Sequence, residues 1–515
     1  MSDVSAFARL VGAGWVLVRA DLLIPRELDP MLPPSVRGGA RLLRLFCGPQ
    51  ARQGRPGERL ARAFERLGPA TIKLGQVLST RADIFGKEFA DDLGRLKDRL
   101  PPFPTVVARA AIAQTLDRPV ESLFTEFSDP IGAASLAQAH AATLTDGRKV
   151  AVKVLRPGVE RLVAKDLEML ALAARIIERL APPARRLEPK ALIATVSRSM
   201  TLELDLRLEA AGASELGEIM AKDGFMQAPK VVWPGVGRRA LTLEWAGGVA
   251  LSDPAALEQP GIDRHALADN LVRAFLSQAL DFGVFHADLH EGNLFVAAPS
   301  TITAIDFGIL GRLDAKARRH LAEILWGFLQ RDYMRVAKAH FDAGYVPQHH
   351  SIEAFAQALR AVGEPSVGRA SAEVSMGRLL GLLFEITAIF DMRLRPELVL
   401  LQKTMVTVEG VSRRIDPSHN LWASAEPVVS RWITRELSPM TRARELAENA
   451  SRALKALAQL AEPQGLHAAD GAHERAQRER RRQARDQRHG PPLVWFALGA
   501  AVSGIAFMAA AFLGR

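Results

Sequence analysis

One short segment concentrates side chains that could do chemistry: "GVFHADLHEGNLF", residues 283–295, contains His286, Asp288, His290, Glu291 and Asn293. Two kinds of site use such a cluster. A metal centre would take His286, Asp288 and His290 as ligands. A phosphoryl-transfer loop would use Asp288 to orient a nucleophile and Asn293 to hold a divalent cation. The sequence offers no further histidine cluster nearby to complete a closed metal shell, so the second interpretation is favoured, with His286 bracing the loop.

A phosphoryl-transfer site needs further groups in a fixed order along the chain. A strand lysine grips the nucleotide phosphates, a helix carboxylate holds that lysine, and an aspartate at a strand end binds the metal. "VAVKV" supplies Lys153, "LELDLRLEA" supplies the carboxylates, and "IDFG" supplies Asp306. Each motif alone is weak. In this order, together with Asp288 and Asn293, they predict phosphoryl-transfer architecture.

Two departures from ordinary protein kinases limit the substrate. No GxGxxG precedes Lys153, and the nearest match, "GVGRRA" at 235–240, lies downstream and lacks its last glycine. The small residues of "PIGAASLAQAH" (130–140) stand in its place and would let the backbone approach phosphates. After "IDFG" the chain turns helical at once in "DAKARRHLAEIL" and has no APE motif. A protein substrate is therefore not expected.

The elements that must position these groups follow from periodicity. Residues 60–100 and 160–220 have helical spacing, and nearly everything from Asp263 to about 460 reads as helix. Strands are predicted in "KVAVKVLRP", "APKVVWPG", "RRALTLEWAGG", "NLFVA" and "TITAID". The segment between Asp288 and Asp306 has room for a loop and one short hairpin. The pattern predicts an α+β, two-lobed protein-kinase-like fold with an added N-terminal helical extension.

The C-terminal region predicts a membrane anchor. A basic run at 473–490 is followed by an uncharged run from Leu493 to Leu513, long enough as a helix to cross a hydrocarbon core of about 30 Å. The arginines on its N-terminal side keep residues 1–490 in the cytoplasm. We therefore expect a tail anchor in the cytoplasmic membrane. The stretch 4–25 carries charges and suits an interfacial or core-docked helix better, and a lone Cys47 excludes a disulfide framework.

Several longer segments resemble the UbiB/ADCK family of atypical kinases. They are "GPATIKLGQVLSTRADIF", "PIGAASLAQAH", "VAVKVLRPGV", "LELDLRLEA", "HADLHEGN" and "IDFGILGRL", and the likeness runs from about residue 60 to "VEGVSRRIDP" at 408–417. The resemblance implies a kinase-like fold that binds ATP with Mg²⁺, acts as an ATPase and supports ubiquinone biosynthesis. Bacterial members were long labelled 2-polyprenylphenol 6-hydroxylases, but nothing here resembles a flavin or iron oxygenase site.

The resemblance also implies roles for single residues. Lys153, Asp288 and Lys73 are the expected catalytic residues, and Asn293 and Asp306 the expected metal ligands. Lys153 is expected to pair with Glu203 or, second, Asp205, while Glu209 is left to stabilise its helix. The remaining implied residues are Lys73, Gly75 and Gln76 of a KxGQ helix, and the nucleotide-binding residues Lys153, Gly132, Ala133, Ala134, Ser135, Glu244, Trp245 and Ala246.

The chain departs from the family pattern in three regions: the alanine-rich loop, the catalytic loop and the C-terminal region. Gly132 stands where the family more often has alanine, which would change nucleotide affinity. Leu289 and Glu291 replace the usual prolines of the catalytic loop. Only one terminal span is visible, where bacterial members often show two.

The predicted organisation is an N-terminal helical segment (1–50), the KxGQ extension (51–130), a kinase-like N-lobe (131–248), a helical C-lobe (249–440), a basic linker (441–492) and the membrane anchor (493–513). The expected partners are the lipid membrane, isoprenoid quinone precursors and other quinone-biosynthesis proteins, with no nucleic acid; pairing with a second copy is left open. Two other functions compete with a quinone-supporting ATPase: a small-molecule kinase of the aminoglycoside or choline kinase type, and a non-catalytic nucleotide-binding scaffold.

Overall fold

The computed structural model describes residues 3–23, 25–31, 34–79, 86–94, 96, 101–180, 188–367, 386, 389–392 and 396–436. The chain divides into a larger unit, which contains residues 1–430, and a smaller one of residues 431–500. The predicted basic run and membrane anchor lie outside the described residues. Among the residues that are described, no helix is both long and apolar enough to cross a membrane. The predicted domain boundaries stay predictions.

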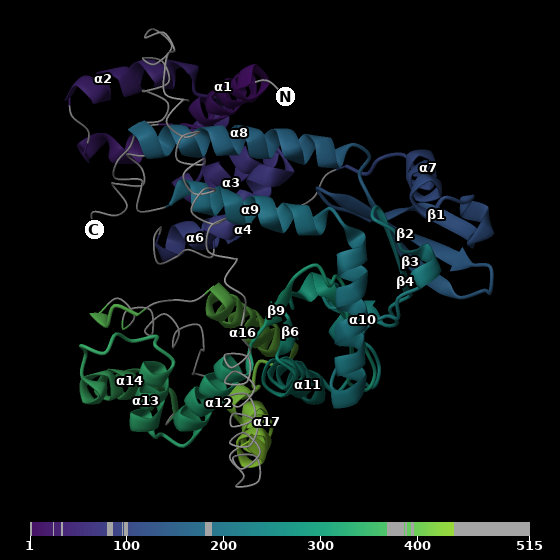
Figure 1. Ribbon diagram of the computed structural model, residues 1–515, viewed down its shortest axis with the longest axis vertical. Coiled ribbons are helices and arrows are strands. Elements are labelled where there is room, and N and C mark those ends of the chain that lie inside the picture. Colours follow the sequence, from purple (N-terminus) through teal and green to yellow (C-terminus); the bar gives the residue numbers. More distant parts are fainter. Residues whose placement is uncertain are drawn as a thin grey trace, which may run out of the picture. The chain divides into compact units, whose positions relative to one another are not determined.

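An N-terminal group of helices packs against two later ones (Figure 1). It consists of α1 (Asp3–Arg19), α2 (Pro34–Leu43), α3 (Pro56–Leu67), α4 (Pro69–Ser79) and α6 (Lys87–Gly94), and the later helices are α8 (Val159–Leu180) and α9 (Pro189–Glu203). α1 contacts α8, and α4 contacts both α8 and α9. Gly68, at φ 116°, ends α3 and Pro69 starts α4, since glycine tolerates that backbone angle and proline suits a first helical turn. The predicted helical spacing is confirmed where residues are described.

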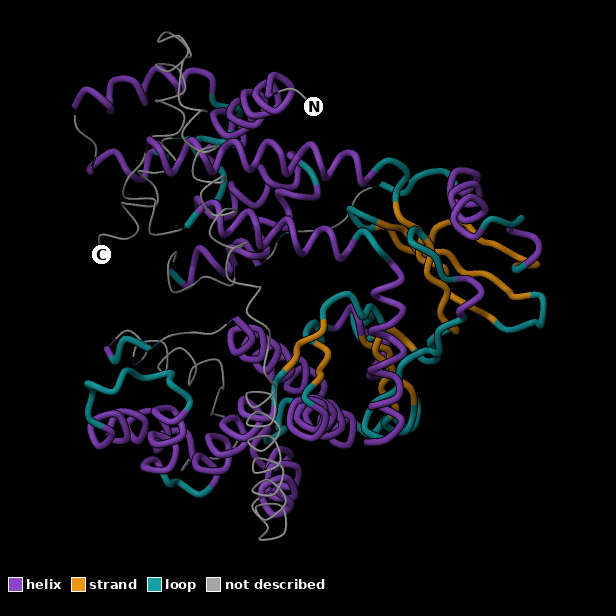
Figure 2. Tube along the Cα trace, in the orientation of Figure 1, coloured by secondary structure: helices purple, strands orange, loops and turns teal. Residues whose placement is uncertain are grey.

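A four-stranded antiparallel sheet follows, in the order β1-β2-β3-β4 (Figure 2). Its strands are β1 (Phe124–Ala133), β2 (Ala137–Leu144), β3 (Lys149–Leu155) and β4 (Ala240–Glu244). Val150, Val152 and Val154 of β3 are fully buried in a core with α7 (Thr105–Leu116). Because side chains alternate along a strand, Lys153 points to the opposite face of the sheet. The predicted strands at β3 and β4 are confirmed.

The strand predicted in "APKVVWPG" is wrong. The segment forms only an isolated bridge between Val231 and Leu243 and a 3-10 turn at Trp233–Gly235. Pro229 and Pro234 flank it, and prolines cannot donate to a ladder of hydrogen bonds. The segment instead borders β4 without extending it as a strand.

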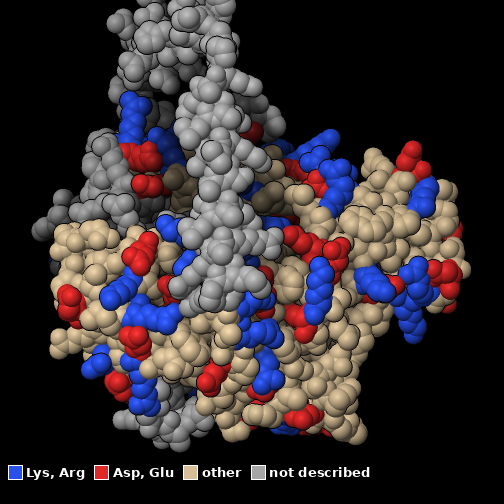
Figure 3. Space-filling model, turned by 60° about the horizontal axis from the view of Figure 1, so that its bottom comes forward, with Lys and Arg blue, Asp and Glu red and all other residues tan. Residues whose placement is uncertain are grey.

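The rest of the larger unit is mostly helical, with short strands between the helices. The elements are α10 (Leu206–Asp223), β5 (Val249–Ala250), α11 (Arg264–Ser277), β6 (Val284–His286), β7 (Leu294–Ala297), β8 (Thr301–Ala304), β9 (Leu310–Arg312), α12 (Ala315–Leu329), α13 (Tyr333–Asp342), α14 (Ile352–Val367), α16 (Pro396–Ile415) and the first part of α17 (Leu421–Glu436), which continues into the smaller unit. β7 and β8 form the predicted hairpin, and α12 confirms the helix predicted after "IDFG". β5 joins that hairpin, and β6 pairs with β9. On the face shown in Figure 3, basic and acidic side chains are interspersed.

Candidate nucleotide and phosphoryl-transfer site

The centre of the candidate site is a three-member charge cluster around Lys153. The Lys153 Nζ donates to both carboxylate oxygens of Glu209, at 2.8 and 2.9 Å, and lies 3.5 Å from Oδ2 of Asp306. The alternation of β3 aims Lys153 away from the valine core, and α10 brings Glu209 to it. Glu209 is buried on the same face of α10 as Ala213 and Leu216. A strand lysine held by a helix carboxylate beside a metal-binding aspartate is the arrangement that grips a nucleotide.

The predicted partners of Lys153 were wrong. Glu203 forms an ion pair with Lys73 of α4, and Asp205 pairs with Arg207 at 2.6 Å. The cause is a helix break: α9 ends at Glu203 and α10 begins at Leu206, with the side chain of Asp205 capping α10 by accepting from the Arg207 amide. The break turns the three carboxylates in different directions. A usable signal was present, since Glu209 falls in the apolar stripe of α10, where an unpaired carboxylate would be costly.

The cluster shifts the pKa of each of its members. Burial acts to lower the pKa of Lys153, but the charges of Asp306 and Glu209 outweigh it, so the pKa is raised and the ammonium stays charged. The Lys153 charge holds the pKa of Asp306 below its usual value. Burial raises the pKa of Glu209, and the neighbouring carboxylates of Asp306 and Glu203 add to this, while Lys153 opposes it. Asp306 is thus kept ionised, as a cation ligand must be.

The predicted bracing role of His286 is confirmed. This residue is fully buried, its Nδ1 accepts from the Asp288 amide at 3.1 Å, and its Nε2 lies 3.3 Å from the Ile305 carbonyl. Both ring nitrogens are therefore engaged, and the pKa of His286 is lowered by burial. His290 uses its Nδ1 to accept from the Gly292 amide at 3.0 Å. The alternative of a metal centre built on His286, Asp288 and His290 does not fit these contacts.

The structure brings the two predicted metal ligands together through the β7–β8 hairpin. The register pairs Leu294 with Ala304, and the Ile305 amide donates to the Asn293 carbonyl at 2.8 Å. This sets Asn293 beside the residue that precedes Asp306. The amide nitrogen of Asn293 donates to the Asp288 carbonyl at 3.0 Å and lies 3.5 Å from the Asp288 carboxylate. An amide oxygen and a carboxylate are oxygen ligands of the kind that Mg²⁺ takes, so the residues present fit that ion.

The backbone at Asp306 is held in an unusual conformation. Its φ of 62° lies in the left-handed region, and its own carboxylate accepts from the Gly308 amide at 3.3 Å. α10 rests directly on the next residues: a Cβ on Gly212 would lie 3.2 Å from the Phe307 carbonyl oxygen and 3.1 Å from a Leu310 methyl. Glu209 and Gly212 lie on adjacent turns, so one face of α10 both holds Lys153 and supports the turn that presents Asp306.

The predicted alanine-rich loop lies at the β1–β2 turn. The Ala134 amide donates to the Ala137 carbonyl at 2.8 Å, Ser135 is buried, and Arg156 donates to the Ala134 carbonyl at 2.9 Å. Ala139 of β2 pairs with Lys153 of β3 in register, so the sheet places this loop near the lysine. A Cβ on Gly132 would meet nothing within 4 Å. The glycine is therefore not required by space, and alanine would fit there.

The hydrogen bonds of β4 limit which backbone groups of the predicted adenine-binding segment could bind a base. The Glu244 amide donates to the Lys230 carbonyl at 2.9 Å, and the Trp245 amide donates to the Lys149 carbonyl at 3.0 Å. The Glu244 carboxylate pairs with Arg148 at 2.8 Å. Among the three predicted residues, these two N–H groups already have partners, so a base would depend on Ala246 and on carbonyl oxygens.

The predicted KxGQ helix is α4. Lys73 reaches Glu203 at the end of α9, which ties α4 to the segment just before α10. Gly75 is buried, and a Cβ there would lie 2.3 Å from Leu96 and 2.8 Å from Phe64. A side chain at this position would force Leu96 and Phe64 to move, so the close packing favours glycine. Gln76 follows on the same helix and is only partly buried.

Sequence reasoning missed two contacts from α16 to the catalytic loop. The Thr404 hydroxyl lies 3.2 Å from the Ala287 carbonyl, and Arg414 forms an ion pair with Glu291. Glu291 is the residue that replaces a usual proline. Arg414 belongs to the segment "VEGVSRRIDP", which could have signalled its partner through charge. α16 therefore supports the loop that carries Asp288.

Comparison with known proteins agrees with this geometry. A model of the ABC1 atypical kinase-like domain matches residues 95–340, and a model of the UbiB helical domain matches residues 359–420. The fold is thus a kinase-like α+β fold, and the site defines a protein of the atypical kinase class. The chain belongs to the UbiB family.

Two relatives are similar over most of their length. A protein of Marinobacter nauticus named "Probable protein kinase UbiB" is 39% identical over 439 residues, which is 84% of this chain and 79% of that protein. One of Xylella fastidiosa with the same name is 38% identical over 397 residues, 76% of this chain and 72% of that protein. A solved complex of Rv3197 with erythromycin from Mycobacterium tuberculosis aligns with 20% identity and a TM-score of 0.48, over 70% of this chain and 93% of that one. That structural likeness is too distant to add to the argument, whereas the sequence relatives favour the UbiB interpretation over a small-molecule kinase.

Proposed function

We propose that the protein is a Mg²⁺-dependent ATPase of the atypical kinase type, and that its turnover supports ubiquinone synthesis at the cytoplasmic membrane. The observation that carries the proposal is the charge cluster of Glu209, Lys153 and Asp306. Lys153 is held from one side by a buried carboxylate, and Asp306, whose pKa is lowered by Lys153, is kept ionised. A scaffold that only binds a nucleotide would not need Asp288, the loop aspartate that orients a nucleophile, beside these groups.

Each residue of the cluster has a stated task in this proposal. Lys153 binds the nucleotide phosphates, and Glu209 keeps its ammonium turned toward them. Asn293 and Asp306 would hold Mg²⁺, which supplies charge neutralisation to the phosphates when bound. Asp288 orients the attacking water, and its backbone is fixed by His286 and Asn293. Water, rather than a peptide, is the acceptor in this proposal because α12 follows so soon after Asp306.

An exposed apolar surface at the N-terminus supports contact with a membrane. It consists of Val11, Trp15, Leu42, Leu45 and Phe46, each about half or more exposed. The Trp15 and Phe46 rings lie 5.7 Å apart, so α1 and the segment after α2 contribute to one patch. Aromatic and aliphatic side chains gathered on a helical surface suit an interfacial position. We propose that this surface and the predicted C-terminal anchor hold the protein at the membrane, near isoprenoid quinone precursors and the enzymes that modify them.

The test has a biochemical and a cellular arm. Purified full-length protein should release phosphate from ATP only with Mg²⁺ and without forming a phosphorylated acceptor. Asp306→Asn should abolish this release, whereas Glu121→Gln, which removes an exposed carboxylate that pairs with Arg109 in the sheet lobe, should not. A phosphorylated small molecule appearing in step with ATP loss would favour the kinase alternative instead.

In cells that lack the gene, quinone content should fall and should be restored by the wild type and by Glu121→Gln but not by Asp306→Asn. Unchanged quinone content after deletion would separate the ATPase from ubiquinone synthesis. Full rescue by Asp306→Asn would show that the quinone role does not need the metal site.

A further inference from the structure

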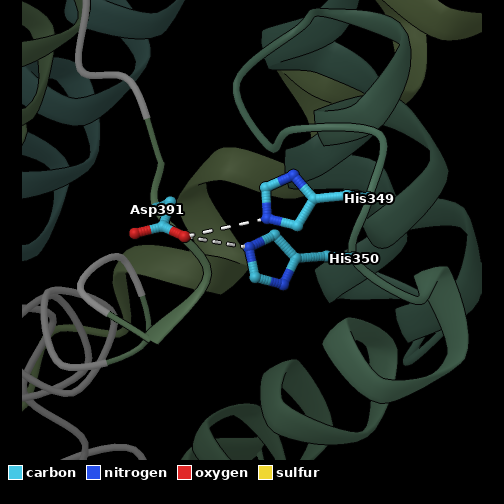
Figure 4. A group of neighbouring side chains, drawn as sticks. All are labelled: His349, His350 and Asp391. Carbon is cyan, nitrogen blue, oxygen red and sulfur yellow. Dashed lines mark hydrogen bonds and ion pairs between the residues drawn. The ribbon is translucent and has the colours of Figure 1, made fainter.

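A second cluster of chemically active side chains lies on the helical lobe. His349 and His350 end the loop between α13 and α14, and Asp391 precedes α16 (Figure 4). The Nε2 atoms of His349 and His350 lie 3.8 and 3.3 Å from Oδ2 of Asp391. All three side chains thus point their ligand atoms at one place, with those atoms within 4.8 Å of one another.

The spacing suits a single transition-metal ion. In a tetrahedral zinc site the metal–ligand distances are about 2.0–2.2 Å, which places neighbouring ligand atoms about 3.3–3.6 Å apart. The His350–Asp391 distance of 3.3 Å falls in that range, and the His349–Asp391 distance of 3.8 Å lies just above it. Two imidazoles and one carboxylate are the donors that zinc-like ions prefer, whereas Mg²⁺ and Ca²⁺ take oxygen ligands.

Part of the cluster is held in place before any ion arrives. The His350 ring packs 5.3 Å from the buried Phe390 ring, and its backbone amide donates to the Pro347 carbonyl at 3.2 Å. Phe390 in turn packs 4.9 Å from Phe355 of α14. Asp391 directly follows Phe390, so the same packing sets both His350 and Asp391. His349 and Asp391 are 66% and 69% exposed, which gives solvent water access to a fourth position.

We propose that His349, His350 and Asp391 form a binding site for one divalent transition-metal ion of the zinc class, with water completing the shell. The site is separate from the nucleotide site and does not depend on its function. His350 and Asp391 are 41 positions apart in sequence, so a bound ion would cross-link two distant segments. The ion would tie the α13–α14 loop to the chain that enters α16, the helix whose Thr404 and Arg414 contact the catalytic loop.

The competing explanation is a set of histidine–aspartate ion pairs with no metal. The chain offers a matched control, because His265 is 68% exposed and lies 2.9 Å from Asp416. His265 and His349 therefore have similar exposure and one carboxylate partner each. They differ in whether a second imidazole points at the same carboxylate.

The test titrates Zn²⁺ into full-length protein, freed of any affinity tag, with saturating Mg²⁺ to occupy oxygen-rich sites. Free Zn²⁺ is followed with a chromophoric chelator, and Co²⁺ is used in parallel, because a tetrahedral site gives it a visible absorption band. We expect one tightly bound equivalent and a raised melting temperature. His349→Gln and Asp391→Asn should each weaken binding at least about tenfold, and His265→Gln should leave it unchanged.

Equal binding by wild type, His349→Gln and Asp391→Asn would overturn the proposal, as would the absence of any bound equivalent in the wild type. Metal-free melting temperatures of the variants show whether they fold, and both substitutions lie at exposed positions. His350→Gln gives a third ligand variant. Binding is measured without ATP, so a failure of the proposed ATPase would leave this result intact.

Discussion

Two lysine–glutamate pairs lie next to each other in this protein and are built for different purposes. Lys153 and Glu209 join the sheet to α10, and a third charge, Asp306, stands 3.5 Å from the lysine. Lys73 and Glu203 join α4 to the end of α9. The negative charge of Glu203 is close enough to raise the pKa of Glu209. The comparison teaches that the first pair holds a lysine beside a third charge, while the second joins two helices.

The strongest way to break the comparison is to remove the carboxylate of each pair in turn. Glu209→Gln should lower the kcat/KM for ATP by about a hundredfold, or about 2.7 kcal/mol of transition-state stabilisation, since Lys153 loses the carboxylate that holds its ammonium in place. Glu203→Gln should cost less than tenfold, because Lys153 keeps both of its partners. Steady-state phosphate release measures both. If the Glu203 variant loses as much as the Glu209 variant, the pairing in the working enzyme is the one that the sequence predicted.

Gly75 lies on α4, the helix that carries Lys73, so a substitution there tests the stability of this helix apart from the Lys153–Glu209 pair. Gly75→Ala should lower the free energy of unfolding by about 1–3 kcal/mol, because the new methyl group overlaps Leu96 and Phe64. The effect should fall on the helix that carries Lys73. Chemical denaturation gives the stability, and ATP turnover of the folded fraction should remain near the wild-type value. Gly132→Ala is the matched control, since the space around Gly132 is open; an equally large loss there would contradict the packing argument.

How much the sequence could predict depends on the range of each interaction. β3, the β7–β8 hairpin and α12 were predicted because alternation and helical spacing are local properties. The order of Lys153, Asp288, Asn293 and Asp306 along the chain predicted a phosphoryl-transfer site, and the roles of these residues stay predictions. The partner of Lys153 was harder to choose, since three carboxylates share one short stretch and only the apolar stripe of α10 distinguished Glu209. The choice is made by the helix break at Leu204 and Asp205 and by α4, which brings Lys73 from a distant part of the chain.

Local sequence patterns likewise could not predict the cluster of His349, His350 and Asp391. Neighbouring histidines invite a metal-ligand interpretation, yet their carboxylate lies far along the chain. The packing of Phe390 against His350 and Phe355 brings it back. The contacts of Thr404 and Arg414 with the catalytic loop likewise depend on where α16 lies, which periodicity does not determine.

Lowering the pH should reduce kcat/KM through Glu209 but not through Glu203, with a smaller effect than the substitutions above. Glu209 must be ionised to hold Lys153, and its pKa is raised to about 7 by burial. As the pH falls through that value the carboxylate takes up a proton, so kcat/KM should fall about tenfold per pH unit. Protonation of Asp306 belongs to a lower pH, because Lys153 lowers its pKa. Glu203→Gln should keep this acid limb and Glu209→Gln should lose it. A limb that begins only near pH 4 would show that Glu209 does not control the lysine.

The energetic coupling between Lys73 and Glu203 is the smallest of the expected effects and the most specific. In a double-mutant cycle of Lys73→Met and Glu203→Gln, the coupling energy for unfolding should be about 1 kcal/mol, a usual size for two side chains in direct contact. The same cycle measured on the kcat/KM for ATP should give a coupling near zero, because neither residue touches Lys153 in this arrangement. A coupling in turnover larger than the one in stability would mean that α4 acts on the nucleotide site through Glu203. Lys73 and Glu203 would then act on Glu209 as well, and the two lysine–glutamate pairs would no longer have separate roles in turnover and stability.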